Sequence, residues 1–252
     1  MLELVTLRAR SDLRGQVFSD KIQGSWPEFM LHDPVADLYF TDAALNAYLD
    51  TAFAIIDSAD PTTAVGRAFA VPFSFGELPH RMELPASGWD GIIRWAHHDR
   101  VIGRPLNAVS ALEITILPSY RGQGASRVIL DAMRQHVQSL GYQHMFAPVR
   151  PTTKHLEPLT SMVEFVNRRG EGGLPADPWL RVHARAGGEI VKIAPASMVI
   201  SGSVNDWSRW AGMSFPRSGD VVVPGALVPV HVSLEQDHIV YVEPNVWIRH
   251  VV

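Results

Sequence analysis

The chain has 252 residues, no cysteine, 46% hydrophobic residues and a formal net charge of −4. This length allows one large domain or two small ones, and the 19% of charged residues is ordinary for a globular protein rather than a disordered one. The absence of cysteine excludes disulfides, thiolate nucleophiles and cysteine-ligated metals. The slightly acidic balance and the lack of a long apolar run predict a cytoplasmic protein with neither nucleic acid nor a membrane as its partner.

The first hundred residues alternate strand and helix signals. Residues 2–7 alternate apolar and polar side chains, which is typical of a strand. Residues 42–56 carry apolar side chains at helical spacing, which predicts a helix with Thr41 as its N-cap. Residues 64–72 are predicted to form a second strand. Residues 73–106 form a long insertion of turn signals around a short amphipathic segment at 89–98.

The middle of the chain gives the clearest signal. Residues 107–117 are a strand by their β-branched content, and a glycine turn at 121–126 leads into a helix that runs to about Leu140, with Gly141 as its stop. Residues 143–149 then form a short strand. This order is a βαβ unit, so the two strands belong to one sheet with a crossover helix on one face.

The remaining chain is predicted to be helical at first and then mostly β. A helical piece at 159–166 precedes a helix that Asp177 caps, with Pro178 at its first position and Gly187-Gly188 at its end. Residues 189–194 form a strand, and residues 228–233 and 238–242 form a hairpin in a β-rich C-terminal extension at about 195–252. No repeat or linker is present, so we expect a single domain over 1–252.

The glycine turn is a candidate anion site. Backbone N–H groups converge in such a strand-to-helix turn, with the positive end of the helix dipole behind them. A Walker-type phosphate loop is excluded because no Gly-Lys-Ser/Thr ends the turn. A dinucleotide fold is disfavoured because Arg127 replaces the third glycine and no acidic residue stands about twenty residues further on.

The turn is similar to that of the GNAT acyltransferase superfamily, Arg/Gln-x-x-Gly-x-Gly/Ala after a strand, with Ser126 as the one departure. The resemblance implies a mixed α/β (α+β) fold with a central mixed sheet flanked by helices, and an acyl-CoA-binding core at about 107–149. It also implies that the residues around the turn bind the cofactor: Ile116, Leu117, Arg121, Gly122, Gln123, Gly124, Ala125 and Ser126. We expect the backbone amide near Leu117 to polarise the thioester carbonyl.

Glu113 is the candidate base. Leu112, Ile114 and Ile116 are expected on one face of their strand, with Glu113 on the other. A carboxylate in the middle of a central strand is costly unless it is solvated or paired. Glu113 would therefore either face a cleft and take a proton from an amine, or form a structural salt bridge with an arginine.

His183 is the candidate acid, by resemblance alone. In the run from Val182 to Gly187 it stands where the superfamily has a tyrosine that protonates the departing thiolate. An imidazolium can do this chemistry. A solvated histidine near the end of a helix is an equally good interpretation.

The function that these signals favour is an N-acyltransferase that uses acetyl-CoA or another acyl-CoA, with no metal, to acylate a small-molecule amine by direct transfer in a ternary complex. The alternatives are a carrier-bound acyl donor, decarboxylation of an acyl thioester, or a sensor that binds acyl-CoA without turnover. Apolar segments at 221–223 and 241–242 would form an edge for a homodimer, or would pack inside a monomer.

Overall fold

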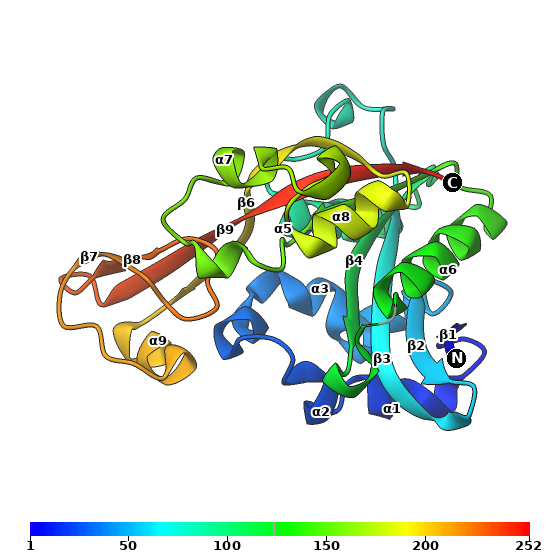
Figure 1. Cartoon of the computed structure of the whole chain (residues 1–252), viewed down its shortest axis with the longest axis horizontal. Helices are drawn as coiled ribbons and strands as arrows, with labels where there is room; N and C mark the ends of the chain where they lie inside the picture. Colours follow the sequence, from blue (N-terminus) through cyan, green and yellow to red (C-terminus); the bar gives the residue numbers. More distant parts are fainter. Residues whose placement is uncertain (123) are drawn as a thin grey trace.

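The computed structural model describes residues 1–122 and 124–252. Figure 1 shows a long twisted sheet with helices on both faces, and the long C-terminal strand is one of the strands of this sheet. The strands are β1 Leu2–Thr6, β2 Ala52–Asp57, β3 Asp60–Phe73, β4 Ala108–Ile116, β5 His144–Val149, β6 Glu189–Gly202, β7 Gly219–Val221, β8 Val230–Ser233 and β9 His238–Val251.

Helices connect these strands. The α-helices are α1 Arg14–Val17, α2 Asp20–Gln23, α3 Asp37–Phe40, α4 Asp42–Leu45, α5 Gly88–Ile102, α6 Ala125–Ser139, α7 Met162–Asn167, α8 Pro178–Arg185 and α9 Val204–Ala211. Short 3-10 helices lie between them: η1 Ser11–Leu13, η2 Glu28–His32, η3 Pro34–Ala36, η4 Asn46–Tyr48, η5 Pro79–Arg81, η6 Pro118–Tyr120, η7 Lys154–Leu156 and η8 Glu171–Gly173. No helix in these two ranges is long and apolar enough to cross a membrane.

The nine strands form one sheet in the order β1-β2-β3-β4-β5-β9-β8-β7, and β6 pairs with β9 as well. The pair β4–β5 is parallel, as predicted for the βαβ unit, and the other described pairs are antiparallel. This mixed sheet with flanking helices confirms the predicted fold class.

Each face of the sheet buries its own apolar cluster. On one face α6, α7 and α8 pack through residues such as Met133, Phe165 and Leu180. On the other face α5 and the short N-terminal helices cover a larger cluster rich in aromatic side chains, including Phe69 and Trp207. The two faces have different coverings, so the sheet offers two chemically distinct approaches to its central strand β4.

The helix predicted at 42–56 is wrong beyond its first turn. Thr41 does cap α4, since its side chain accepts a hydrogen bond from the Ala44 amide, but residues 52–57 form β2. Residues 52–56 are all buried, and β2 pairs with β1 on one side and β3 on the other. A short apolar run buried on both faces fits a central strand as well as a helix, and strand pairing decided between them.

The C-terminal segment differs from the predicted extension in two respects. β9 lies between β5 and β6, so the last strand belongs to the central sheet rather than to an appendage. Residues 204–211 form α9, which was not predicted. Ser203 and Asp206 cap it reciprocally, a Ser-x-x-Asp signal that the sequence carries. The predicted hairpin is confirmed as β8 and the first residues of β9.

Candidate active site

The predicted glycine turn leaves β4 and enters α6. Gly122 and Gly124 have φ of 87° and 79°, in the left-handed region that favours glycine, and a Cβ built on either would meet no atom within 4 Å. Gly124 is the N-cap of α6, and because glycine has no side chain it makes no capping hydrogen bond to the first turn of this helix. The Ala125 amide, however, donates to the Gly122 carbonyl at 2.9 Å, so it is used inside the turn. Gln123 lies outside the described residues.

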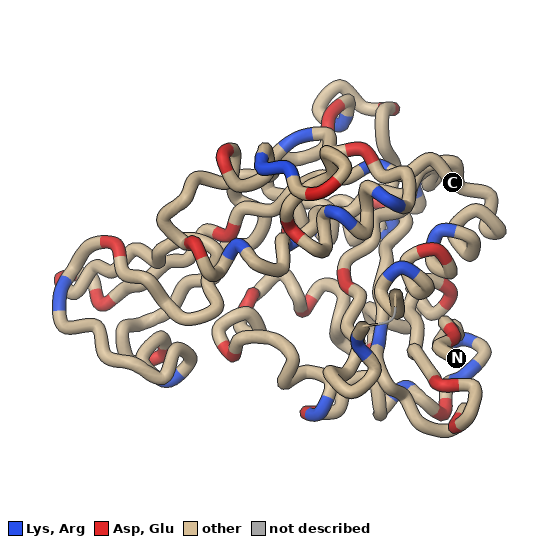
Figure 2. The backbone as a smooth tube through the Cα atoms, in the orientation of Figure 1, with Lys and Arg blue, Asp and Glu red and all other residues tan. Residues whose placement is uncertain are grey.

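Arg121 ties this turn to the end of β4. Its Nε donates to the Ile116 carbonyl at 2.7 Å, and its Nη2 lies 3.5 Å from the Ser25 hydroxyl. More basic residues follow along α6 and α8, on the side that faces the viewer in Figure 2. The glycine turn, Arg121 and these helices together form a surface suited to an anion with several phosphates.

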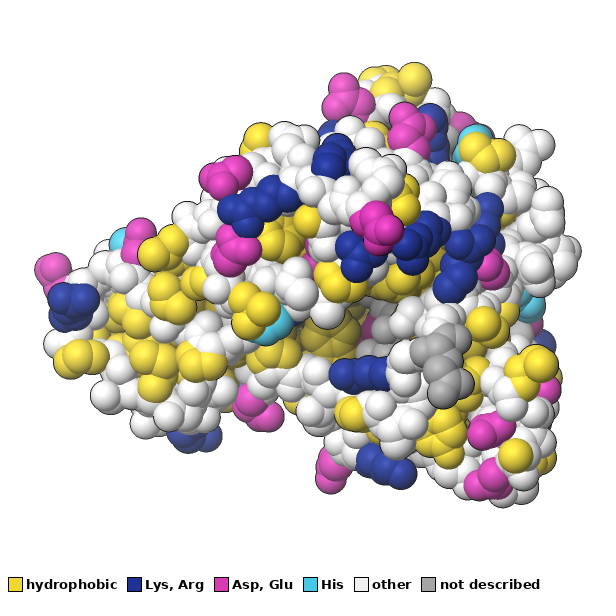
Figure 3. Space-filling view, in the orientation of Figure 1, with side chains coloured by type: hydrophobic (Ala, Val, Ile, Leu, Met, Phe, Trp, Pro, Cys, Tyr) yellow, Lys and Arg dark blue, Asp and Glu magenta, His cyan; other side chains and the backbone are white. Residues whose placement is uncertain are grey.

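A gap opens between β4 and β5. The two strands are paired only at Val109 with Met145 and at Ser110 with Phe146, although β4 continues to Ile116. Beyond Ser110 the β5 side of β4 has no partner among the described strands, while β3 still pairs with its other side. The space-filling view shows the surface hollowed beside the end of β4 (Figure 3). A narrow chain with amide groups could fill this gap by hydrogen bonding to the unpaired edge.

The Leu117 amide is not directed into this gap. It donates to the Val65 carbonyl of β3 at 2.9 Å, so the amide near Leu117 that was predicted to polarise a thioester has to be a neighbouring one. Because amides alternate in direction along a strand, those of Ile114 and Ile116 point away from β3 and toward the gap. These two amides are therefore better placed to meet a carbonyl oxygen there.

A bulge in β4 changes the direction of Leu112. Phe69 pairs with Glu113 but the next residue, Ala70, pairs with Ala111, so Leu112 is the extra residue. The Leu112 carbonyl accepts a hydrogen bond from the Trp89 indole at 3.2 Å. Leu112 consequently packs in the aromatic-rich cluster, on the same face as Glu113, whereas it was predicted to point the same way as Ile114.

Glu113 is held firmly by one of its two oxygens. Oε1 accepts hydrogen bonds from Trp26 Nε1 at 3.0 Å, Arg67 Nε at 2.8 Å and the Thr115 hydroxyl at 2.6 Å. The Arg67 and Glu113 side chains are each 7% exposed. Oε2 accepts no hydrogen bond from the described residues. The predicted salt bridge with an arginine is therefore present, and the second oxygen is left for another partner.

His183 lies on the opposite face of the sheet from Glu113. Its side chain is 2% exposed, its Nδ1 lies 2.9 Å from Nε2 of His250 on β9, and it packs edge-on against Trp179. Burial, followed by the charges of His250 and Arg134, holds the pKa of His183 well below its usual range. Its role as a proton donor stays a prediction, one that a buried neutral imidazole does not favour.

The face that carries Glu113 also holds three acidic residues that the sequence analysis missed. Asp33, Asp90 and Glu243 are 3%, 1% and 0% exposed. Glu243 is paired with Arg150, and Asp90 Oδ2 lies 3.8 Å from Arg94 Nη2. The carboxyl groups of Asp33 and Asp90 lie against each other and share a hydrogen bond. Burial and then the neighbouring Asp33 raise the pKa of Asp90 to about 8.

These acidic residues come from separate parts of the chain. The Asp90 carboxylate accepts a hydrogen bond from the Val199 amide of β6 at 3.3 Å. Burial, with a smaller contribution from the charge of Glu243, raises the pKa of Asp33. No sequence pattern joins them, because Asp33 is the N-cap of η3 whereas Asp90 and Glu243 lie in α5 and β9. Among the described residues, no three His, Asp or Glu side chains are placed to hold a metal ion.

Comparison with known proteins supports the fold. No family profile matches the chain. A curated relative, the arginine N-acetyltransferase avaD of Aspergillus versicolor, is 28% identical over 275 residues, covering 98% of this chain and 93% of the relative. The loading GNATL domain of CurA from Lyngbya majuscula has the same fold, with a TM-score of 0.53 at 15% identity over 100% of this chain and 98% of that domain. The GphF GNAT-like decarboxylase, solved with isobutyryl-CoA, has a TM-score of 0.49 at 13% identity, and the match covers 100% of this chain and 98% of the decarboxylase.

Proposed function

We propose that the chain is an acyl-CoA-dependent N-acetyltransferase of the GNAT superfamily, and that it transfers the acetyl group directly to a small cationic amine while both substrates are bound. The observation that carries this proposal is the gap between β4 and β5, which ends beside the glycine turn. One substrate would enter from the α6–α8 face and the other from the face that carries Glu113.

The donor side of the gap suits coenzyme A. The amides of Gly122, Gly124 and Ser126, at the positive end of the α6 dipole, would hold the pyrophosphate. The open space around both glycines leaves room for its oxygens. The unpaired edge of β4 would bind the amide-containing arm, and the Ile114 and Ile116 amides would stabilise negative charge on the thioester oxygen.

On the acceptor side, Glu113 would act as the base. The amine nitrogen attacks the thioester carbonyl, the carbon–sulfur bond breaks, and Glu113 takes the proton that the nitrogen loses, directly or through a water molecule. The thiolate leaves with the electron pair of the broken bond and takes a proton from solvent or from a protein donor. The hydrogen bonds to Oε1 would fix the carboxylate so that Oε2 meets the amine.

Two observations support a cationic acceptor. Asp33, Asp90 and Glu243 lie on the acceptor face, where these three buried carboxyl groups are paired with only two arginines among the described residues, Arg94 and Arg150. An approaching cation would favour the ionised form of Asp90, since opposite charge lowers a carboxyl pKa. The curated relative is named for acetylating arginine. We therefore propose arginine, or an amine of similar size and charge, as the acceptor.

The test compares arginine with citrulline as acceptors. Citrulline has nearly the same shape but no side-chain charge, so it isolates the electrostatic contribution. We expect thiol release from acetyl-CoA with arginine, with mass spectrometry showing the acetylated amine, and a kcat/KM lower by at least about tenfold for citrulline, equivalent to about 1.4 kcal/mol. Equal kcat/KM values would contradict a cationic acceptor.

Other outcomes would identify the alternative functions. Stabilisation of the fold by acetyl-CoA without thiol release for any amine would indicate a sensor. Release of carbon dioxide from malonyl-CoA in the absence of an amine would indicate decarboxylation. No stabilisation by any acyl-CoA, with turnover only when the acyl group is supplied on a carrier protein, would indicate a carrier-bound donor.

A further inference from the structure

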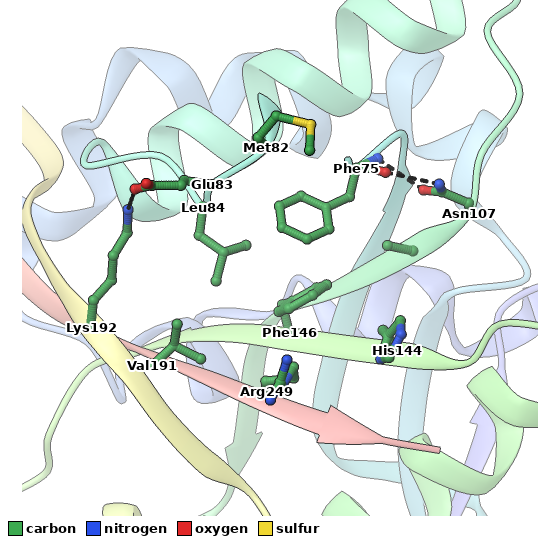
Figure 4. Close-up of a pocket in the computed structure, with 11 residues that line it drawn as sticks. Phe75, Met82, Glu83, Leu84, Asn107, His144, Phe146, Val191, Lys192 and Arg249 are labelled. Carbon is green, nitrogen blue, oxygen red and sulfur yellow. Dashed lines mark hydrogen bonds and ion pairs between the residues drawn. The ribbon is translucent and has the colours of Figure 1, made fainter. Parts of the chain in front are cut away.

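A second cavity lies away from the gap, against the first residues of β4 and β5. It has a volume of about 450 Å³, within the range of small-molecule sites. Its walls come from the connection between β3 and α5, from β5 and β6, and from the C-terminal end of β9 (Figure 4). The acetyl-transfer chemistry uses the opposite ends of β4 and β5, so nothing proposed above explains this cavity.

The body of the cavity is apolar and partly aromatic. Phe75 and Phe146 face each other with ring centroids 5.0 Å apart, and Met82, Leu84 and Val191 line the space around them. Leu84 and Phe146 are buried, but Met82 is 62% exposed. A thioether and two rings at an open cavity form a surface on which an aromatic ring packs well.

The two basic residues at this cavity are each paired with an acidic one, since Arg249 forms an ion pair with Glu189 and Lys192 with Glu83. Lys192 and Arg249 line it from β6 and β9, with Glu83 as the one acidic residue among the lining side chains. Lys192 Nζ lies 3.2 Å from Glu83 Oε2 across the opening (Figure 4), an exposed ion pair that contributes little stability. Nδ1 of His144 is buried and lacks a hydrogen-bond partner among the residues described.

We propose that this cavity binds a small carboxylate with an apolar, preferably aromatic, body. The ring lies against Phe75, Phe146 and Met82, and the carboxylate replaces Glu83 as the partner of Lys192. The exchange costs little, since both Glu83 and Lys192 are at the surface and Glu83 regains its hydration. This site is independent of the acceptor and of coenzyme A.

The test uses 3-phenylpropanoate as the probe and 3-phenylpropylamine as its charge-reversed counterpart, with binding measured by isothermal titration calorimetry. We expect the carboxylate to bind and the amine to bind at least about fivefold more weakly. Lys192→Gln should weaken the binding of the carboxylate about fivefold, and Glu83→Gln should tighten it by a similar factor because it releases Lys192.

The paired variants keep the outcome unambiguous. Both positions are at the surface, and acetyl-CoA affinity measured in parallel reports whether each variant is folded. The proposal would be overturned if the two probes bound equally well, or if neither variant changed the affinity for 3-phenylpropanoate. Binding that persists unchanged in both variants but is lost on saturation with acetyl-CoA would place the probe in the gap between β4 and β5 instead.

Discussion

Glu113 shows how one buried carboxylate can be both structural and available for chemistry. A charge inside a sheet requires compensation, and Arg67, Trp26 and Thr115 all supply it to the same oxygen. Removing the side chain would leave the Arg67 guanidinium buried without its partner, which typically costs about 3–5 kcal/mol. A variant that removes only the basicity is therefore needed to test the role of Glu113.

Glu113→Gln is that variant. The amide oxygen can keep the hydrogen bonds of Oε1 while Nε2 replaces Oε2, so the base is lost and the packing is kept. We expect kcat for acetyl transfer to fall by about 10²-fold or more, with acetyl-CoA affinity nearly unchanged. Thiol release measures the first quantity, and a thermal-shift titration measures the second.

Glu171→Gln serves as the control, because Glu171 is exposed on η8, far from the gap in sequence. It should leave both quantities unchanged. If Glu113→Gln retained full turnover, Glu113 would be a purely structural residue and the amine would lose its proton to another group.

At the scale of elements, the turn between β4 and α6 combines two requirements. The chain must reverse direction with φ in the left-handed region at Gly122 and Gly124, and it must leave the first amides of α6 uncapped. Since a Cβ at Gly124 would meet no atom, a side chain there is limited by backbone strain and by what binds the turn, not by crowding. Substitutions at this position can therefore separate strain from charge.

Gly124→Asp and Gly124→Asn form a matched pair. Asn and Asp both tolerate the left-handed region, and they have nearly the same size. If the turn holds pyrophosphate, the carboxylate of the Asp variant repels it, and we expect the Kd for acetyl-CoA to be at least about tenfold higher in Gly124→Asp than in Gly124→Asn. Isothermal titration calorimetry measures both values, and equal Kd values would exclude a phosphate at this turn.

At the scale of the whole molecule, the sheet separates two environments. The aromatic-rich face carries Glu113 and the acidic residues, and the opposite face carries α6, α8 and the buried pair His183–His250. Burial, with the charge of Arg134, lowers the pKa of His250 to about 4. Both imidazoles are therefore neutral in the folded protein near pH 7, and protonating either opposes folding.

Acid should destabilise the fold through this histidine pair. Both folded pKa values lie below the unfolded value near 6.5, so the unfolded chain binds more protons as the pH falls. Their stabilising contribution is complete above pH 6.5 and is lost as the pH falls, and the part from His250 amounts to on the order of 3 kcal/mol by about pH 4. Urea unfolding at pH 7, 5.5 and 4.5 measures this loss as a decrease in the free energy of unfolding.

His250→Gln should flatten this pH dependence, since glutamine can donate to His183 and cannot titrate in this range. His238→Gln, at an exposed position of β9, should behave like the unmodified protein. An equally steep loss of stability in His250→Gln would mean that other groups cause the acid sensitivity.

Local signals in the sequence determined the βαβ unit, the glycine turn that borders the gap, and the caps at Thr41 and Asp177. Each of these depends on a few neighbouring residues whose backbone preferences and side-chain hydrogen bonds act over one or two turns. The resemblance to an acyltransferase superfamily rested on the same short segment. The candidate base, Glu113, was also found this way, because a carboxylate is unusual in the middle of an apolar strand.

Only the tertiary structure decided which strands are neighbours and which side chains meet. It placed β9 between β5 and β6, made a strand of residues 52–57, and turned Leu112 to the face of Glu113 through a bulge. It also brought Arg67 and Trp26 to Glu113, and Asp33 close to Asp90 and Glu243. These contacts join residues far apart in the chain, so burial and strand pairing across the whole sheet determine them, and no local pattern contains that information.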